Sequence, residues 1–385
     1  MSLLDKASLI ITPNAEKVGK LYSVIPSDGS GDLTVVRGTT ATRVNSLGLV
    51  ENVAVNEPRL NYDTVGGCPA ILIEPQRTNL ALRSEEFNDA LWLKTNGATI
   101  TANSEISPSG ALNADLMTAT AVFSQVQATH TVVSGNTYTT SMWIKRISGT
   151  GQVFFRSIEN ANTSITITNQ WVRYSVTTTA TSTTGRIGVQ LVVSGDSVAI
   201  WGAQLELGAY PTSYIPTLGS IQTRNADGIS NTSISPLIGQ TEGTFFIDFQ
   251  NKANEVTTGV VVRVLYTITD GTANNRFSHS IIKTSTRNYT DITIRSNNVT
   301  VSNINVDTPT GRFKIAVSYK IGATKMFING VLVGNVGLSE IPIINRLFLG
   351  CSTTTGGENA NVSINNFLTV KTALTDIECI NLTTL

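Results

Sequence analysis

Short apolar runs alternate with polar positions along most of the chain, and Gly, Asn, Asp and Ser separate the runs. Period-two alternation places side chains on the two faces of a β-strand, and the 3.6-residue period of a helix is almost missing. Two short segments, 84–93 and 374–382, are exceptions, because each opens with a hydroxyl residue and acidic residues that favour a helix N-terminus. The pattern predicts an all-β fold with two brief helices.

The predicted strands fall into groups that suggest domain boundaries. Residues 1–78 are rich in turns and contain too few apolar runs to form a large core. We therefore expect this segment to be β-rich and to serve in docking. Longer strands over 79–217 predict a jelly roll, the polar stretch 218–240 predicts a linker, and strands over 241–385 predict a second sandwich. The expected architecture is therefore two antiparallel β-sandwich (jelly-roll) domains behind a short N-terminal segment.

One turn can be predicted in detail. Asn329 and Gly330 stand between two apolar runs, and Asn-Gly is the pair that a two-residue hairpin turn favours. We expect a tight hairpin at this point of the second sandwich.

The charge of the chain excludes one class of partner and favours another. Lys plus Arg and Asp plus Glu number 27 each, so no excess positive charge is present to bind nucleic acid. Only 14% of residues are charged, against about 25% in ordinary soluble domains. A nearly neutral surface rich in Thr, Ser and Asn favours self-association, so a homodimer or homotrimer is expected.

Neither a membrane span nor a targeting segment is predicted. No apolar run reaches about 18 residues. Residues 1–17 lack a basic stretch and a small-residue cleavage site, so we expect synthesis in a cytoplasm and no membrane insertion. Cys68, Cys351 and Cys379 show no metal-site spacing, and each is expected to be a small buried residue.

Catalytic patterns are weak in this sequence. Glycan hydrolysis in sandwich folds needs two nearby carboxylates, whereas Asp248 stands alone on its predicted strand. His130 and His279 lie far from any nucleophile motif, and both are interpreted as surface strand residues. We therefore predict that the protein is not an enzyme and that it needs no catalytic cofactor.

Binding residues are easier to suggest than catalytic ones. Tyr210 and Tyr214 stand beside prolines and are candidates for a glycan or an interface, although they can equally pack the linker against the jelly roll. The four Trp residues are expected in cores. The Gly-rich run 28–32 alternates oxygen ligands like a calcium loop but lacks the later acidic residue, so structural calcium stays an open alternative to a simple turn.

Several segments of the sequence resemble a known family. Residues 200–208 (IWGAQLELG) and 210–217 (YPTSYIPT) resemble the closing strand and exit of carbohydrate-binding-module-like jelly rolls in fibre and appendage proteins of tailed bacteriophages, and 79–115 looks like the opening of that module. The segments 313–335 and 365–382 are similar to concanavalin-A-like or laminin-G-like sandwiches. The resemblance implies a virion surface protein, on the head or the tail.

The resemblance sets the expected function and its alternatives. It implies a structural fibre or appendage in which residues 1–78 dock to other virion proteins and the sandwiches adhere to host cell-surface polysaccharide. A free lectin-like glycan-binding protein and a glycan depolymerase are the alternatives. The sequence leaves open the place on the particle, the stoichiometry, the docking partner and the glycan.

Overall fold

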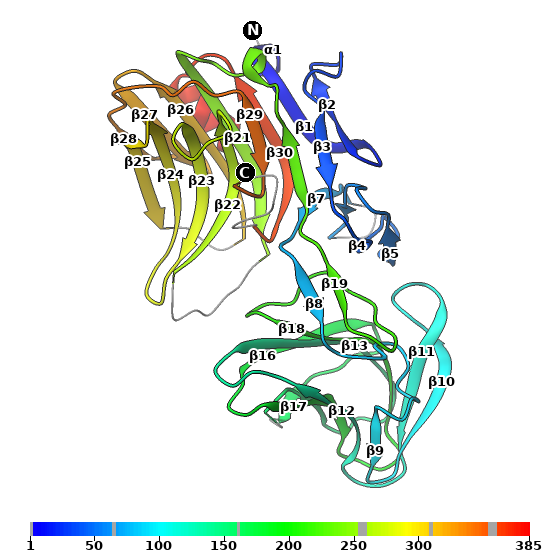
Figure 1. Cartoon of the computed structure of the whole chain (residues 1–385). Helices are drawn as coiled ribbons and strands as arrows, with labels where there is room; N and C mark the ends of the chain where they lie inside the picture. Colours follow the sequence, from blue (N-terminus) through cyan, green and yellow to red (C-terminus); the bar gives the residue numbers. More distant parts are fainter. Residues whose placement is uncertain (1–2, 64–66, 160–161, 253–259, 308–310, 353–359) are drawn as a thin grey trace. The chain divides into compact units, whose positions relative to one another are not determined.

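The computed structural model describes residues 3–63, 67–159, 162–252, 260–307, 311–352 and 360–385, and the fold is all-β as predicted. The chain divides into two compact units, each drawn in Figure 1. Unit 1 contains residues 1–40, 53–75 and 225–385, and unit 2 contains residues 41–52 and 76–224. In the described part of the chain, no helix is long and apolar enough to cross a membrane.

Unit 1 is built on one long antiparallel sheet that folds over its own core. Its strands follow in the order β25 (Val299–Asp307), β24 (Asn288–Ser296), β23 (Arg276–Lys283), β22 (Val261–Thr269), β29 (Arg346–Leu349), β20 (Gly228–Asn231), β3 (Leu33–Val36), β2 (Lys20–Ile25), β1 (Ala7–Lys17), β30 (Val362–Val370), β21 (Glu242–Asn251), β26 (Arg312–Lys320), β27 (Ala323–Ile328) and β28 (Val331–Val336). The short strand β7 (Ala70–Ile73) pairs with β30 and with β6 (Leu60–Asn61). At the two ends of this path, Gly334 of β28 lies against Ile304 of β25, so the sheet forms a sandwich.

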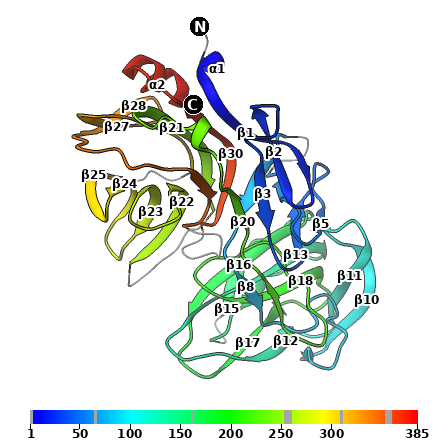
Figure 2. The same ribbon diagram turned by 45° about the horizontal axis from the view of Figure 1, so that its top comes forward.

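Alternation along β21 explains how this sheet is covered on both faces. Phe245, Ile247 and Phe249 point into the sandwich core, and Phe246 between them belongs to a second cluster on the outer face. The helix α2 (Asp376–Thr383) supplies Cys379 to that second cluster, and Figure 2 shows α2 near β28 and the short α1 (Leu3–Lys6). The C-terminal helix therefore buries apolar side chains that the sandwich leaves outside.

Two local predictions in unit 1 are confirmed. Asn329 and Gly330 both have positive φ, at 48° and 82°, as a type I′ turn between β27 and β28 requires. Thr375 caps α2, and it forms a capping box with Glu378. The hairpin and the last helix thus follow from local sequence.

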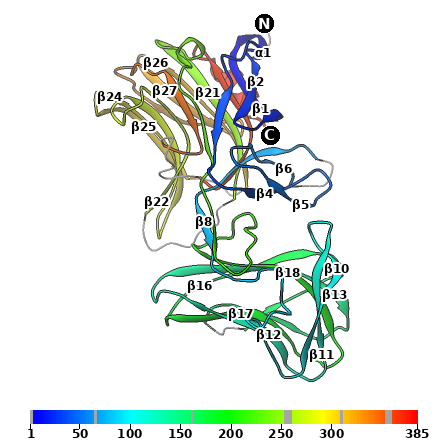
Figure 3. The same ribbon diagram turned by 45° about the vertical axis from the view of Figure 1, so that its right-hand side comes forward.

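Unit 2 is a sandwich of two five-stranded sheets (Figure 3). One sheet has the order β10 (Ala98–Ile106), β11 (Leu112–Ala119), β18 (Ser197–Leu207), β13 (Thr137–Ser148) and β16 (Val172–Thr179). The other has the order β15 (Asn162–Ile165), β14 (Val153–Arg156), β17 (Thr184–Leu191), β12 (Ser124–Thr131) and β9 (Leu93–Thr95). Two two-stranded pairs complete the unit: the hairpin of β4 (Ala41–Val44) and β5 (Val50–Val53), and the pair of β8 (Arg77–Asn79) with the sequence-distant β19 (Gln222–Arg224).

The structure divides the chain differently from the segments expected from the sequence. Within residues 1–78, β1 pairs with β30, which makes the start of the chain an integral part of the unit 1 sheet. The expected linker 218–240 contains β19, β20 and the 3-10 helix η1 (Ser235–Leu237). Short strands can be completed by pairing with strands that are distant in sequence, and local composition does not record that pairing.

The helix predicted over 84–93 is wrong. This segment forms a series of turns, in which Glu86, Asp89 and Trp92 each donate a backbone hydrogen bond to the residue three positions earlier. The Ser84 hydroxyl bonds to Tyr214 and to the backbone of Thr217 instead of capping a helix. A tertiary contact has therefore replaced the local helix signal.

Candidate functional site

An aromatic cluster lies on the outer face of the β10–β11–β18–β13–β16 sheet of unit 2. Trp201 of β18 is 2% exposed, and Tyr214, which follows β18, is 3% exposed. Their ring centroids are 4.7 Å apart, and the Trp143 ring lies 5.2 Å from Trp201. The buried rings of Trp201 and Tyr214, with the partly buried ring of Trp143 against them, give this face of the sheet a small core of its own.

The β4–β5 hairpin covers this cluster. Val50 of β5 packs against the rings, and its backbone N–H donates to the carbonyl of Pro108 at 2.9 Å. The Thr42 hydroxyl of β4 donates to the Tyr214 carbonyl at 2.6 Å. The hairpin thus holds the N-terminal part of unit 2 beside the aromatic cluster.

A pocket of about 180 Å³ remains between the hairpin and the cluster. We call this cavity the hairpin pocket, and its lining residues are Thr42, Val50, Glu51, Asn52, Glu85, Ser109, Asn113, Trp201, Tyr214 and Pro216. Two carboxyl groups, two amides, three hydroxyls and two aromatic rings, one of which carries the third hydroxyl, therefore meet in one small space.

Glu85 is the more buried of the two acids, and its carboxyl is held by neighbours. The Tyr214 hydroxyl donates to one oxygen at 2.9 Å, and the Asn113 amide donates to the other at 2.9 Å. Burial raises the pKa of Glu85, and the hydrogen bonds from Tyr214 and Asn113, together with the nearby indole N–H of Trp201, offset only part of that rise. Glu85 is consequently easier to protonate than an ordinary glutamate.

The pKa of Glu51 is shifted in the opposite direction. Arg43 donates to one of its oxygens at 2.8 Å, and Asn45 donates to the other at 2.9 Å. Burial alone would raise the pKa of Glu51, but these two hydrogen bonds and the charge of Arg43 outweigh it, so the pKa lies below its usual value. The two acids of the hairpin pocket therefore differ in proton affinity.

Two further polar atoms of the pocket residues are buried without a hydrogen-bond partner of good geometry. They are the indole N–H of Trp201, a donor, and the Oδ1 of Asn113, an acceptor. The Trp201 N–H nevertheless lies close enough to Glu85 to lower the pKa of that carboxyl. Leaving such groups unpaired costs about 1–3 kcal/mol each, so a ligand that satisfies them gains binding energy.

The structure separates the two tyrosines selected from the sequence. Both are buried, which fits the alternative in which they pack against the jelly roll. Tyr214 lines the hairpin pocket, whereas Tyr210 lies outside it, with the guanidinium of Arg77 4.9 Å from its ring centroid. A glycan contact at Tyr214 remains a prediction.

Other residues chosen from the sequence have structural roles. Asp248 accepts two hydrogen bonds from Arg312, at 2.7 and 2.6 Å. His130 and His279 are buried, so their interpretation as surface residues was wrong, as was the burial predicted for Cys68, which is exposed. The sequence did not reveal the burial of either histidine, and His279 is paired with Tyr266 and Ile292 on the two adjacent strands.

The carboxylates of the acidic loop 28–32 already accept hydrogen bonds from residues in the loop and close to it. Asp28 accepts from the backbone N–H and hydroxyl of Ser30, and Asp32 accepts from Ser23 and Lys20. Among the residues that the structure describes, no group of three or more His, Cys, Asp or Glu side chains could hold a metal ion. The loop is an Asx-type turn in this structure.

Sequence reasoning missed most of the hairpin pocket. The sequence pattern predicts Glu85 only in the first turn of a helix and Trp201 only in a core. Glu51 and Asn113 gave no local signal, because the hairpin at 41–53 meets β11 only through tertiary folding. Tyr214 is the one residue of this pocket that the sequence predicts as a binding residue.

No family model and no curated protein matches the chain. Weak likenesses to solved structures include a Ruminococcus gnavus IT-sialidase CBM40 bound to α2,3-sialyllactose, with 16% identity and a TM-score of 0.32 over 38% of this chain and 84% of that one. A leech intramolecular trans-sialidase matches with 16% identity and a TM-score of 0.31 over 38% of this chain and 24% of that one. The binding domain of botulinum neurotoxin DC matches with 15% identity and a TM-score of 0.33 over 41% of this chain and 39% of that one. Likenesses this weak assign no ligand to the chain.

Proposed function

We propose that the protein is a non-enzymatic adhesion protein that binds a host-surface glycan in the hairpin pocket. The observation that carries the proposal is that Trp201, Asn113 and Glu85 line one small pocket in which the Trp201 N–H and the Asn113 Oδ1 have no hydrogen-bond partner of good geometry. A sugar hydroxyl both donates and accepts, so a pair of hydroxyls can satisfy all three groups.

The size of the pocket limits what can enter. Ligand sites for drug-sized molecules usually have volumes of about 300–1,000 Å³. The hairpin pocket, at about 180 Å³, is smaller, so it would admit one sugar unit at the end of a chain or on a branch. Recognition would depend on hydrogen bonds to hydroxyls, because the rings of Trp201 and Tyr214 are too buried to stack on a sugar face.

The test uses the full chain on a printed array of neutral and acidic glycans. Trp201→Phe removes the indole N–H while keeping a ring in the cluster, and Asn113→Ala removes the acceptor. Each should weaken binding to the best array glycan about tenfold, as expected for a lost buried hydrogen bond. Asn88→Ala, at an exposed amide of the same unit, is the matched control. Unchanged affinity in both pocket variants would rule out this site.

Hydrolysis is a second candidate, because one specific observation favours it. Glu51 and Glu85 line the same pocket, and their surroundings move their pKa values in opposite directions, as in an acid and base pair. Both oxygens of each carboxyl already accept hydrogen bonds, however, which suits fixed binding groups better than groups that transfer protons.

A reducing-end assay separates the two functions. The wild-type protein is incubated with the polysaccharide that carries the best array glycan, and new reducing ends are counted. We expect none above the buffer control. Release of reducing ends that disappears in Glu85→Gln would make the protein a depolymerase and would overturn the non-enzymatic proposal.

The location on a bacteriophage virion and the oligomeric state are part of the same proposal. The phage-like phrases at 200–217 and the neutral, hydroxyl-rich composition support them. Immunogold labelling should place the chain on the surface of intact particles, and light scattering should give a dimer or trimer at micromolar concentration. Particles without label would contradict the location on the virion, and a monomer would contradict the predicted oligomer.

A further inference from the structure

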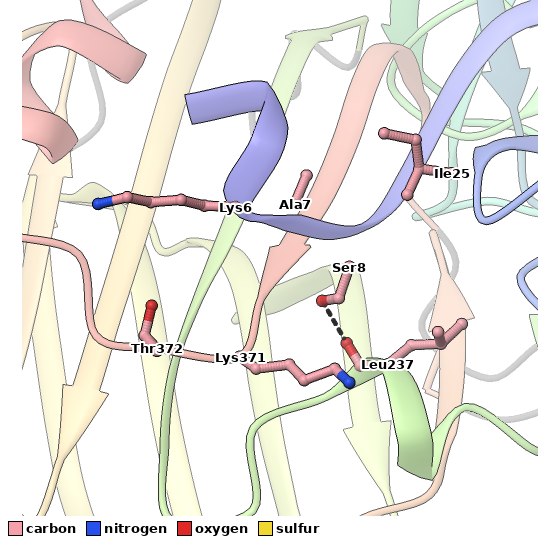
Figure 4. A pocket seen from close by; sticks show the side chains of 7 residues that line it. All are labelled: Lys6, Ala7, Ser8, Ile25, Leu237, Lys371 and Thr372. Carbon is pink, nitrogen blue, oxygen red and sulfur yellow. Dashed lines mark hydrogen bonds between the residues drawn. The ribbon is translucent and has the colours of Figure 1, made fainter. Parts of the chain in front are cut away.

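A second cavity lies in unit 1 and shares no lining residue with the hairpin pocket. It is an open groove of about 590 Å³ at the start of β1, and we call it the lysine groove (Figure 4). Its lining residues are Lys6, Ala7, Ser8, Ile25, Leu237, Lys371 and Thr372. The volume falls within the range of about 300–1,000 Å³ that is usual for small-molecule sites.

The segments that form the groove are tied together at its base. The Ser8 hydroxyl donates to the carbonyl of Leu237 at 2.7 Å, and it also lies 3.1 Å from the carbonyl of Thr369. The Thr369 hydroxyl donates to the same Leu237 carbonyl at 2.8 Å. β1, η1 and β30 are therefore fixed with respect to one another, so the groove needs little rearrangement to accept a ligand.

The two lysines of the groove differ in their partners. Lys6 forms an ion pair with Glu378, and this hydrogen bond helps to lower the pKa of Glu378 to about 2. Lys371 is exposed and has no acidic or hydrogen-bonding partner among the described residues. Figure 4 shows the two side chains extending to opposite sides, with the Lys371 ammonium on the side of Leu237. The groove therefore offers one uncompensated positive charge.

The remaining lining suits a ligand with an apolar flank. Ala7, Ile25 and Leu237 provide aliphatic surface, whereas the exposed hydroxyl of Thr372 lies on the side of Lys6, away from the Lys371 ammonium (Figure 4). A single free ammonium balances a single negative charge, whereas a phosphate dianion is usually met by several donors or by the fork of an arginine.

From this arrangement we propose that the lysine groove binds a carboxylate, with Lys371 as its counter-ion and the aliphatic residues Ala7, Ile25 and Leu237 against its apolar part. Such a carboxylate could belong to an acidic sugar or to the C-terminus of a peptide. The proposal does not depend on the hairpin pocket, because all of its residues belong to unit 1.

The experiment is a calorimetric titration of the full chain with three probes at low salt. D-Glucuronate and D-glucose differ chiefly in whether carbon 6 carries a carboxylate, and N-acetylalanine represents a peptide C-terminus. We expect a carboxylate probe to bind and glucose not to bind. Preference for glucuronate assigns the groove to acidic sugars, and preference for N-acetylalanine assigns it to peptide termini.

Two variants locate the binding. Lys371→Ala should weaken binding of the carboxylate about tenfold, as expected for a lost charge-assisted hydrogen bond. Lys320→Ala, which removes another exposed lysine of unit 1 outside the groove, should leave the affinity unchanged. Absence of binding by both carboxylates, or an equal loss in the two variants, would overturn the proposal. Retained array binding by Lys371→Ala would show that the hairpin pocket acts separately.

Discussion

The guanidinium of Arg59 donates to the carboxylate of Glu74 at 2.6 Å, and neither side chain is more than 3% exposed. Asp227 joins them by accepting from Arg59 and from Arg37, the latter at 3.0 Å, and it also accepts from the backbone N–H of Glu74 at 2.9 Å. Two arginines and two acids thus form a buried network inside unit 1. These residues lie near the points where the chain leaves unit 1 and returns to it.

Removing one member of this network should be costly. Asp227→Asn leaves two buried guanidinium groups with reduced compensation, so we expect the free energy of unfolding to fall by about 3–5 kcal/mol. Urea unfolding followed by circular dichroism measures the change. The control is Arg287→Ala, which breaks the exposed pair of Arg287 and Asp307 and should cost less than about 1 kcal/mol. Equal losses in the two variants would mean that the network adds nothing by being buried.

His279 should make the stability of unit 1 depend on pH. Burial lowers its pKa to about 3, against an ordinary value of 6.5, so the folded state keeps it neutral while the unfolded chain takes up a proton. Stability from this group is complete above pH 6.5 and is lost as the pH falls from 6.5 toward 3. Each pKa unit corresponds to about 1.4 kcal/mol, so a loss of several kcal/mol is expected.

The variant His279→Gln isolates that effect. Glutamine can keep the hydrogen bond that His279 shares with Thr290 at 2.8 Å, but it does not titrate. The free energy of unfolding, measured at pH 7, 6, 5 and 4, should fall less steeply in the variant, since the carboxyl groups titrate alike in both proteins. Parallel curves for the variant and the wild type would show that His279 is not the source of the pH dependence of stability.

Local physics accounts for the parts of the fold that the sequence predicted correctly. Strand alternation, the Asn329–Gly330 turn and the Thr375 cap each depend on neighbours within a few residues. The division into two units does not depend on near neighbours, because β1, near the start of the chain, pairs with β30, near its end. The hairpin pocket is non-local for the same reason, since Glu51 and Glu85 meet only after the β4–β5 hairpin covers β18. Burial of His279 likewise depends on facing strands that local alternation cannot identify.

Tyr214→Phe should change the acidity of Glu85. The variant removes the phenol O–H that donates to Glu85 at 2.9 Å, so the negative form of the carboxyl loses a stabilising hydrogen bond. The pKa of Glu85 should rise further above its usual value, which carboxyl carbon chemical shifts in a pH titration measure. The spectra of the Trp side chains should stay unchanged if the ring still packs in the cluster. A lower pKa would contradict the role assigned to the phenol.

Gly202 should control the shape of the hairpin pocket. It follows Trp201 in β18, has a φ of 68° and lies at a register shift between β13 and β18. An added Cβ would stand 2.8 Å from the Trp143 ring and 3.4 Å from Tyr214, so Gly202→Ala combines backbone strain with a clash in the aromatic cluster. We expect a loss of about 2–4 kcal/mol in unfolding free energy together with weaker glycan binding.

The control for this variant is Gly135→Ala in the same unit. Gly135 has a φ of 86°, and its added Cβ would meet no atom within 4 Å, so this variant experiences only the backbone strain, about 1–2 kcal/mol. Tryptophan fluorescence during urea unfolding follows unit 2 alone, because all four Trp residues of the chain belong to it. The difference between the two variants measures the clash at Trp143. If Gly202→Ala lost no more stability than Gly135→Ala and bound glycan normally, the contact of Gly202 with the ring would have no part in shaping the pocket.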